Sequence, residues 1–135
     1  MKIQVIVGST RPGRASLGVA RWVAERAREA LKDVEVELVD LASYPLPFFD
    51  EPASPQFNPQ RRPEPGVQAW LDKVSEADGY VLVSPEYNRS FPAVLKNALD
   101  FLDVQFADKP VALVSHGSVG GAHAVVHLRS VLAGV

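Results

Sequence analysis

Four short runs of apolar residues are spaced along the chain, and each has the composition of a buried strand. They cover residues 3–7, 34–40, 80–84 and 110–115, and the first of them stops at Gly8. The last two runs contain YVLV and VALVS, which are apolar at almost every position. Because a strand with one solvated face alternates, such runs are typical of strands that are covered on both faces of a parallel sheet.

Helical patterns separate these runs. From Leu17 to Leu31, apolar residues recur three or four positions apart, which predicts a helix. Further helices are expected over residues 67–76 and 93–103, and from Gly121 or Ala122 onward. The order β-α-β-loop-α-β-α-β-α favours an α/β fold, with a parallel sheet wound with helices on both faces.

The segment between residues 43 and 66 breaks this alternation. It contains seven prolines, so neither a helix nor a central strand is expected there. Long irregular segments inside a compact domain usually act as lids or as interface segments. We therefore expect this proline-rich segment to border a functional site or a subunit contact.

Composition narrows the possible functions. With 135 residues, 47% of them apolar, the chain is expected to form a single domain with a sizeable core. The net charge of −2 argues against nucleic acid as a main partner. The absence of cysteine excludes disulfides and thiol redox chemistry. No apolar run approaches membrane-spanning length, and the start does not resemble a signal peptide, so we expect a cytoplasmic protein with no membrane partner.

Three of the predicted strands end in unusual loops. These loops read GSTRPGRAS after the first strand, PEYNRSFP after the third and HGSVGGAH after the fourth. The carboxyl ends of parallel strands lie at one edge of a sheet, and ligands of open α/β sheets bind there. We therefore expect these loops, which are remote in sequence, to meet around one site.

The first loop has the composition of an anion site. It leads into a helix N-terminus, whose free backbone N–H groups favour negative charge. Ser9, Thr10 and Ser16 add hydroxyl groups. Arg11 and Arg14 add forked positive charge. We expect a monophosphate, although the loop matches neither the Walker A nor the G-x-G-x-x-G pattern. The alternative is a simple helix cap at Ser16 beside solvated arginines.

The second loop suits a flat ring. Pro85 fixes the backbone where the strand ends, and the residues after it turn across the edge of the sheet. A planar heteroaromatic ligand needs backbone N–H donors along one edge and a flat group against one face. The peptides of this turn and the Tyr87 ring can supply both. Taken singly, Tyr87 is also consistent with core packing, and Asn88 with an ordinary turn amide.

The third loop is rich in glycine. Gly117, Gly120 and Gly121 leave room for a ligand, and their peptides can donate hydrogen bonds to ring carbonyl oxygens. His116, just before them, either faces that ring or is a solvated loop residue, and we favour the second interpretation.

Two further histidines follow in the last predicted helix. His123 and His127 lie one turn apart, a spacing that is compatible with a metal. Because no third ligand is evident, we interpret them as exposed histidines and expect no metal site.

Together, the three blocks resemble the NAD(P)H-dependent FMN reductases, a flavodoxin-like family that includes quinone, azo-dye and chromate reductases. The likeness lies in GSTRPGRAS, SPEYNRSFPAVLKNALDFL and SHGSVGGAHAVVHLRSVL, and PEYN…LKNALD is its most diagnostic part. The resemblance implies bound FMN, NAD(P)H as hydride donor and a small-molecule electron acceptor. It also implies a homodimer or homotetramer with the flavin near a subunit interface.

The resemblance further implies which residues contact FMN. Those expected around the phosphate are Ser9, Arg11, Arg14, Ser16 and Leu17. Those expected to border the isoalloxazine are Pro85, Glu86, Tyr87, Asn88 and Ser90. Those expected on its pyrimidine side are Ser115, His116, Gly117, Gly120 and Gly121. Because the flavin performs hydride transfer itself, no side chain is expected to act as general base or nucleophile.

One feature departs from the family pattern. Family members continue through a fifth strand and a final helix, whereas this sequence stops at LRSVLAGV, in or just after the fourth helix. Either that C-terminal part lies outside the sequence, or the sheet has only four strands. A missing edge would expose apolar surface.

Several alternatives stay open at this point. A flavodoxin-type electron carrier is disfavoured, because such proteins tend to be strongly acidic and their Thr/Ser-rich phosphate loop differs from this arginine-bearing one. A non-catalytic module that binds another phosphorylated ligand is a second alternative. A serine hydrolase is disfavoured by the lack of a G-x-S-x-G motif. The sequence decides neither between NADH and NADPH nor among free FMN, a quinone, an azo dye and a metal oxyanion as acceptor.

Overall fold

The computed structural model describes all 135 residues and contains one four-stranded sheet and four α-helices. The strands are β1 (Lys2–Val7), β2 (Glu35–Asp40), β3 (Gly79–Pro85) and β4 (Val111–His116). The helices are α1 (Ser16–Ala30), α2 (Pro65–Ser75), α3 (Ala93–Asp100) and α4 (Ala122–Leu132). The predicted order is confirmed, and each strand agrees with its predicted bounds to within one residue. None of the helices combines the length and apolar composition needed to cross a membrane.

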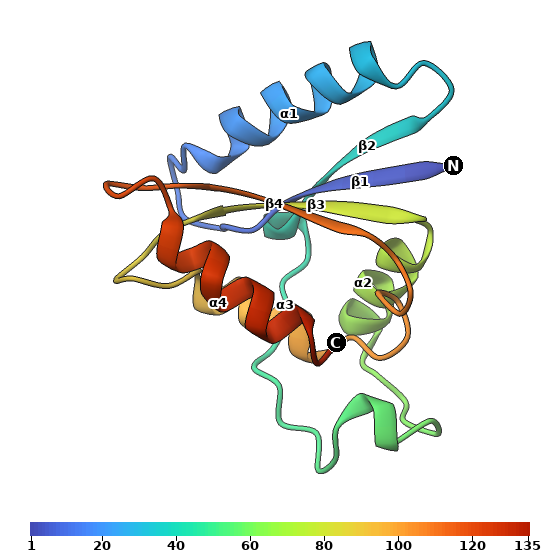
Figure 1. Ribbon diagram of the computed structural model, residues 1–135. Helices are drawn as coiled ribbons and strands as arrows, with labels where there is room; N and C mark the ends of the chain where they lie inside the picture. Colours follow the sequence, from blue (N-terminus) through green and yellow to red (C-terminus); the bar gives the residue numbers. More distant parts are fainter.

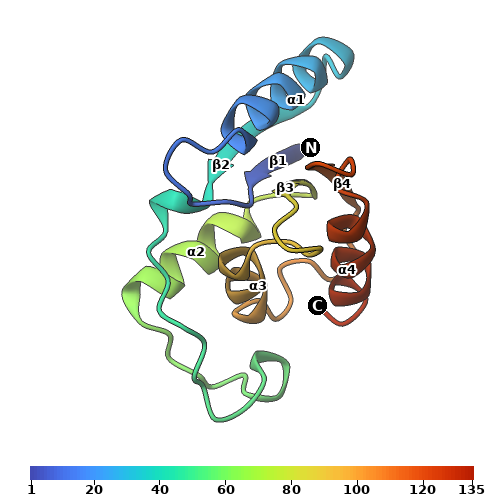
Figure 2. The same ribbon diagram turned by 90° about the vertical axis from the view of Figure 1, so that its left-hand side faces the viewer.

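All strands run parallel, in the order β2-β1-β3-β4. Helix α1 lies on one face of the sheet, and α2, α3 and α4 lie on the other (Figures 1 and 2). From β1 the chain passes outward to β2, then returns across β1 to β3 and β4. The strand order therefore reverses between β1 and β3. Such a switch point is where ligands of doubly wound sheets bind.

Two apolar clusters, one on each face, hold these layers together. The larger joins the sheet to α2, α3 and α4, and it includes Trp70, whose indole N–H donates to the carbonyl of Ala98 at 3.0 Å. The smaller lies beneath α1, where the small residues Ala20 and Ala24 pack on the strands. Strand β3 is buried almost throughout, as predicted, but the edge strand β4 has no buried residue, so the prediction that its run is covered on both faces is wrong. The loops at the strand ends are left to form a site.

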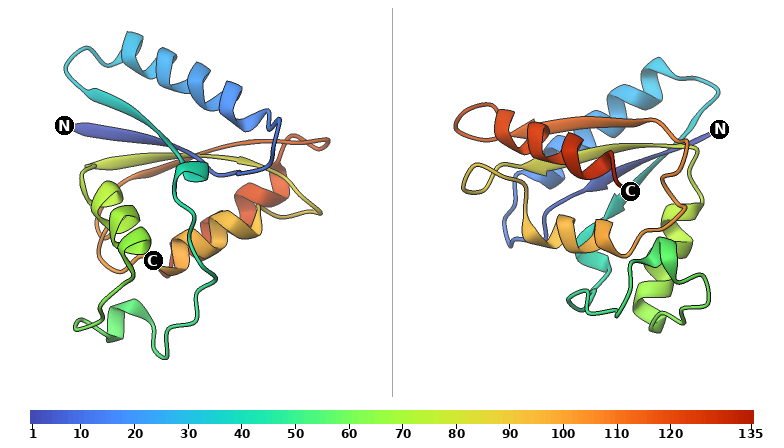
Figure 3. Two further views of the ribbon diagram at one scale, coloured as in Figure 1. Left: turned by 180° about the vertical axis from the view of Figure 1, so that it is seen from behind. Right: turned by 60° about the horizontal axis from the view of Figure 1, so that its bottom comes forward.

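The proline-rich segment runs past α2 and α3, on the same side of the sheet as these helices (Figure 3). The side chain of Asn97 in α3 accepts from Phe49 N at 2.9 Å and donates to Pro47 O at 2.7 Å. Farther along, the Arg61 side chain, which is only 6% exposed, donates to the carbonyl of Phe101, the residue after α3, at 2.6 Å. The segment is thus fastened to the body of the domain at two points.

The boundaries of this segment differ slightly from the prediction. Helix α2 begins at Pro65 rather than at Val67, because proline is suited to the first turn of a helix. Short 3₁₀ helices form at Leu41–Ser43 and Pro55–Phe57. The segment is therefore less irregular than its seven prolines suggest.

Helix α3 ends at Asp100, three residues earlier than predicted. Beyond it, the backbone N–H of Asp103 donates to the Gln105 side chain, and that of Val104 donates to the Asp103 carboxylate. Such local bonds offer the backbone an alternative to the helical ladder, so the helix stops.

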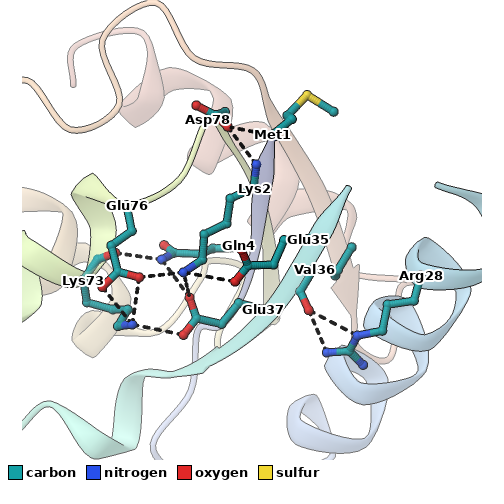
Figure 4. A network of polar contacts seen from close by, with 10 residues as sticks. All are labelled: Met1, Lys2, Gln4, Arg28, Glu35, Val36, Glu37, Lys73, Glu76 and Asp78. Carbon is teal, nitrogen blue, oxygen red and sulfur yellow. Dashed lines mark hydrogen bonds and ion pairs between the residues drawn. The ribbon is translucent and has the colours of Figure 1, made fainter. Parts of the chain in front are cut away.

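At the amino end of the sheet, charged residues form an ionic network (Figure 4). Lys2 Nζ lies 3.4 Å from Glu35, 2.9 Å from Glu37 and 2.6 Å from Glu76. Lys73 of α2 lies 3.0 Å from Glu37 and 3.0 Å from Glu76. Every charge in this network has at least one partner of opposite sign.

Candidate functional site

The loops that follow β1, β3 and β4 meet at the carboxyl edge of the sheet. Strand pairing fixes this convergence, because Val7 pairs with Val83 and Pro85 pairs with His116. A hollow of about 270 Å³, called here the rim pocket, is lined by residues from all three loops. Its lining residues are Arg11, Pro12, Gly13, Arg14, Ala15, Ser16, Pro85, Glu86, Tyr87, His116 and Gly117.

The β1–α1 loop leaves the N-terminus of α1 open. The N-cap residue is Ala15, which has no side chain able to cap, and the first turn contains no acidic residue. Ser16 is already helical, and its hydroxyl group lies 3.0 Å from His116 Nε2. The alternative in which Ser16 merely caps the helix is therefore wrong. The first backbone N–H groups of a helix lack intrahelical acceptors, so this end favours an anion.

The same hydrogen bond corrects the favoured interpretation of His116. This residue ends β4 and is partly buried, with its ring held against the start of α1, so it is not a solvated loop residue. The contact joins the first and third loops across the pocket. Leu17, the next residue of α1, packs its side chain on the cluster beneath the helix. Leu17 can therefore serve a phosphate only through its backbone N–H.

The two arginines of the β1–α1 loop have different surroundings. Arg11 is exposed, and its guanidinium lies 5.9 Å from the centre of the Tyr87 ring, with no carboxylate partner. Arg14 is only 15% exposed in its side chain and forms an ion pair with Asp40 at the end of β2. The Nε atom of Arg14 is buried and has no acceptor. The Arg11 guanidinium is therefore available to an anion, whereas that of Arg14 is already paired with Asp40 and has only its Nε–H free.

Sequence reasoning does not identify Asp40. Its carboxylate accepts both from Arg14 and from the backbone N–H of Ala42. Asp40 therefore joins the β1–α1 loop to the short helix Leu41–Ser43, which leads into the proline-rich segment. A signal was available, because Asp40 is the last residue of a strand beside β1 and so lies on the same edge of the sheet.

The β3–α3 loop contains a tight reverse turn. Tyr87 and Ser90 exchange backbone hydrogen bonds of 2.7 and 3.0 Å. The central residues Asn88 and Arg89 have φ values of 50° and 68°, as a type I′ turn requires. The Tyr87 hydroxyl group lies 3.0 Å from Ser9 Oγ. The Tyr87 ring is thus held at the edge of the sheet, beside the rim pocket, rather than in the core, while Asn88 is exposed at the tip of the turn.

The carboxylate of Glu86 points toward α4. Its carboxylate accepts from the backbone N–H of His123 at 3.0 Å and of Ala124 at 3.4 Å. The side chain is only 6% exposed. Gly121, the N-cap of α4, has no side chain, so Glu86 caps this helix from another loop. Glu86 can therefore contact a ring only through its backbone, and its N–H already donates to His116 O at 2.8 Å.

The glycines of the β4–α4 loop serve different purposes. A side chain at Gly121 would overlap the Ser115 hydroxyl group, and one at Gly117 would crowd Glu86 Cβ at 3.0 Å. Only Gly120, at φ +71°, has open space around it. The Ser115 hydroxyl itself donates to Ser84 O at 2.9 Å. Of these residues, Gly120 is therefore the one at which absence of a side chain leaves room for a ligand.

The histidines of α4 are exposed, as predicted. His123 Nδ1 lies 3.3 Å from Glu86, and His127 Nδ1 lies 3.0 Å from Ser90 Oγ. Both contacts join α4 to the β3–α3 loop. No group of three or more His, Cys, Asp or Glu side chains is arranged to hold a metal ion.

The entire chain, residues 1–135, matches the family model described as NADPH-dependent FMN reductase. The chain belongs to this family. An NAD(P)H-dependent FMN reductase of Schizosaccharomyces pombe is 39% identical over 130 residues, which cover 96% of this chain and 64% of the relative. A probable NADPH:quinone oxidoreductase of Oryza sativa is 38% identical over 136 residues, covering 97% and 66%. This family member thus spans about two thirds of the length of those relatives.

Solved structures agree with this assignment. FerB, a flavoenzyme NAD(P)H:(acceptor) oxidoreductase from Paracoccus denitrificans, matches with a TM-score of 0.76 at 25% identity, over 98% of this chain and 70% of FerB. An azoreductase from Bacillus anthracis matches with a TM-score of 0.71 at 20% identity, over 98% and 80%. The flavodoxin-like fold expected for this FMN reductase family member is confirmed.

The residues of the rim pocket fit the cofactor that the family name implies. A phosphate monoester would meet the open N-terminus of α1, an unpaired Arg11 and the unsatisfied Nε atom of Arg14. Gly120, whose N–H already donates to Gly117 O at 3.0 Å, lies outside the lining of the pocket, so a flat ring would reach the β4–α4 loop at Gly117. Glu86 directs its carboxylate to α4, and Asp40, which pairs with Arg14, does not line the pocket. The donor set therefore suits FMN.

Proposed function

We propose that the chain binds FMN in the rim pocket and acts as an NAD(P)H-dependent oxidoreductase toward a small-molecule acceptor. The observation that supports this most strongly is the joining of three loops around one hollow, with an open helix N-terminus and an unpaired Arg11 on one side. Bound FMN would supply the redox chemistry, taking a hydride from NAD(P)H at N5 and passing two electrons to the acceptor.

In this proposal, the β1–α1 loop binds the phosphate. Arg11 donates charge-assisted hydrogen bonds, and the first backbone N–H groups of α1 complete the anion site. Ser16 and Ser9 act differently, because their hydroxyl groups are used to hold His116 and Tyr87 in place. They fix the walls of the pocket, and any contact with the phosphate shares these bonds.

The other two loops orient the ring. The type I′ turn and the Ser9 contact hold Tyr87 at one wall, and Glu86 fixes the β4–α4 loop by capping α4. Backbone N–H groups of residues 117–119 can then donate to the pyrimidine edge and stabilise the negative charge of a reduced ring, whereas that of Gly120 already donates to Gly117 O. No side chain of the pocket is needed as a general base.

Assembly and location are parts of the same proposal. We expect a homodimer or a homotetramer, because the family resemblance implies a flavin near a subunit interface, and we expect it in the cytoplasm. Exposed apolar side chains such as Phe48, Phe57 and Val94 offer surface for such contacts.

The proposal is tested by the absorbance spectrum of the purified chain after incubation with FMN and removal of free flavin. A retained flavin band that bleaches on anaerobic addition of NADPH, with steady NADPH oxidation once an acceptor is present, is the expected result. A retained band without turnover would indicate an electron carrier instead. A chain that retains no flavin would contradict FMN binding and favour a module for another phosphorylated ligand.

A further inference from the structure

One contact of the rim pocket determines the form of a side-chain ring that lines it. Ser16 Oγ, at the start of α1, lies 3.0 Å from His116 Nε2, at the end of β4. Both residues line the rim pocket, but they differ in exposure, because Ser16 is fully buried and His116 is only partly buried. A ligand in the pocket would therefore meet the His116 ring rather than the Ser16 hydroxyl group.

The burial of Ser16 decides which atom donates in this contact. His116 Nε2 is the only partner of the Ser16 hydroxyl group within the chain, and water does not reach that group. If Nε2–H were the donor, the hydroxyl hydrogen would lie buried without an acceptor, which costs free energy. The Ser16 hydroxyl group therefore donates and Nε2 accepts. A neutral imidazole that accepts at one nitrogen carries its proton on the other, so His116 has the Nδ1–H tautomer.

The Nδ1–H group of His116 is then a donor without an acceptor in the chain, since the only hydrogen bond of the ring is that with Ser16. The backbone of His116 is fixed as well, because its carbonyl accepts from Glu86 N–H at 2.8 Å and the residue pairs with Pro85. The ring cannot turn without breaking its contact with Ser16. The rim pocket is therefore offered a donor in a fixed position.

The surroundings of this donor favour an anion. Beside the ring, the backbone N–H groups of Ser16, Leu17 and Gly18 have no acceptor in the chain. Arg11 lines the same pocket and has no carboxylate partner. A phosphate monoester has three terminal oxygens that accept hydrogen bonds, so it can use the helix N–H groups and the ring together.

We propose that His116 binds a phosphate group directly, through Nδ1–H, and that Ser16 is a positioning residue which fixes the His116 tautomer. This rests on the proposed function, in which the phosphate is that of FMN. It exchanges the roles that the resemblance implies, where Ser16 contacts the phosphate and His116 the pyrimidine side of the flavin. No proton is transferred, and neither residue takes part in the redox step.

The tautomer can be measured without flavin, by proton–nitrogen correlation NMR of the histidine rings. The measurement is made at about pH 8, above the range in which histidines ordinarily titrate. The chain has three histidines, and the signal of His116 is the one that His116→Asn removes. We expect the Nδ1–H form at His116 in the parent chain. Ser16→Ala removes the group that donates to Nε2, so the ring of that variant should shift toward Nε2–H. An Nε2–H ring in the parent chain would overturn the proposal.

Flavin titrations separate a phosphate contact from a merely structural role. His116→Phe keeps a ring without a donor and should raise the Kd for FMN about 10-fold, the effect of one hydrogen bond to a charged group. His116→Asn keeps an N–H donor near the position of Nδ1 and should restore most of that affinity. Neither change should alter the Kd for riboflavin, which lacks the phosphate. An equal loss of affinity for both flavins would show a contact with the flavin ring or a loss of packing, and would overturn the proposal.

A double-mutant cycle tests the role of Ser16. In the Ser16→Ala background, where the tautomer is no longer fixed, His116→Phe should raise the Kd for FMN less than it does in the parent chain. Equal effects in the two backgrounds would show that Ser16 does not act through His116. The matched control is His127→Phe, which breaks another histidine–serine contact, that of His127 with Ser90, outside the rim pocket. It should leave the Kd for FMN unchanged.

The inference and the proposed function can fail separately. If His116→Phe binds FMN as tightly as the parent chain does, the role of His116 is wrong and FMN binding stands. If the parent chain retains no flavin, the proposed function is wrong, and inorganic phosphate becomes the probe. A saturable shift of the His116 NMR signal on addition of inorganic phosphate would then support the phosphate contact, and no shift would overturn it.

Discussion

The two ends of the sheet differ in whether their charged groups are paired. At the amino end, Lys2 and Lys73 share the carboxylates of Glu35, Glu37 and Glu76, so that each of these charges has a partner of opposite sign (Figure 4). At the carboxyl end, the α1 N-terminus is uncapped and the Arg11 guanidinium contacts only an aromatic ring. Paired charges contribute to stability, whereas unpaired donors are available to a ligand.

The pKa values at the amino end reflect this pairing. Hydrogen bonds to Glu76 and Glu37 raise the pKa of Lys2. Burial alone would raise the pKa of Glu37, but hydrogen bonds from Lys2 and Lys73 outweigh it and lower that pKa. Hydrogen bonds from the same lysines lower the pKa of Glu76. The difference between the ends can be tested by perturbing each of them.

The largest expected effect is on the packing of the carboxyl end. Gly121→Ala should lower the free energy of unfolding by about 3 kcal/mol, because the new Cβ overlaps Ser115 and the residue keeps a left-handed backbone. Gly120→Ala is the matched control, since it has a similar φ but open surroundings, and should cost about 1 kcal/mol. Urea unfolding measures both, and equal losses would show that the overlap is relieved without cost.

Next in size is the effect of the unpaired charge on ligand binding. Arg11→Ala should weaken FMN binding about 10- to 100-fold, since a charge-assisted hydrogen bond is lost. It should change the free energy of unfolding of the flavin-free chain by less than about 0.5 kcal/mol, because Arg11 is exposed. Flavin fluorescence titration gives the Kd. The control is Arg26→Ala, which removes an exposed arginine from α1 and should leave FMN affinity unaltered. A comparable loss of affinity in this control would show that Arg11 acts only through net charge.

A smaller effect is expected where the β3–α3 loop caps helix α4. Glu86→Ala removes the acceptor for two backbone N–H groups of α4 and should cost about 1 kcal/mol of unfolding free energy. Glu86→Gln keeps an acceptor oxygen and should cost less. Because the same contact holds the β4–α4 loop, FMN affinity should fall in the same order, as measured by titration. Full affinity in Glu86→Ala would mean that the loop keeps its place without the cap.

The smallest effect is at the amino end, and it depends on pH. Lys2→Met should lower the midpoint of thermal unfolding by a few degrees at neutral pH, since ion pairs that stay in contact with solvent contribute little each. Lowered carboxylate pKa values give stability that exists above the unfolded pKa of about 4.3 and is lost as pH falls through the folded values.

The raised pKa of Lys2 sets the alkaline limit of the same effect. Its contribution is complete below the unfolded lysine pKa of about 10.4 and is lost as pH rises through the higher folded value. The gap between Lys2→Met and the parent chain should therefore be widest from about pH 5 to pH 10. Melting curves at pH 3 and pH 7 with an equal gap would refute the ionic origin. FMN affinity should be unaffected throughout, since Lys2 lies at the far end of the sheet.

Much of this arrangement was predictable from the sequence, because topology alone decides it. Once the runs at residues 3–7 and 80–84 are parallel strands, the loops after them must meet at one edge. The hydrogen-bond partners of the side chains at that edge were not predictable from the sequence. Glu86 turns to a helix end 37 residues away, and Arg14 turns to Asp40, 26 residues away. These pairings depend on loop conformation and rotamers, which leave no periodic signal in the sequence.

The two oxygens of Asp40 have a thermodynamic consequence. One accepts from Arg14 in the β1–α1 loop, and the other accepts from the backbone N–H of Ala42, in the short helix that follows β2. A phosphate that drew Arg14 away from Asp40 would therefore also change how Asp40 caps that helix. By linkage, any event that displaced the helix would alter phosphate affinity by the same factor, with a single carboxylate as the coupling element.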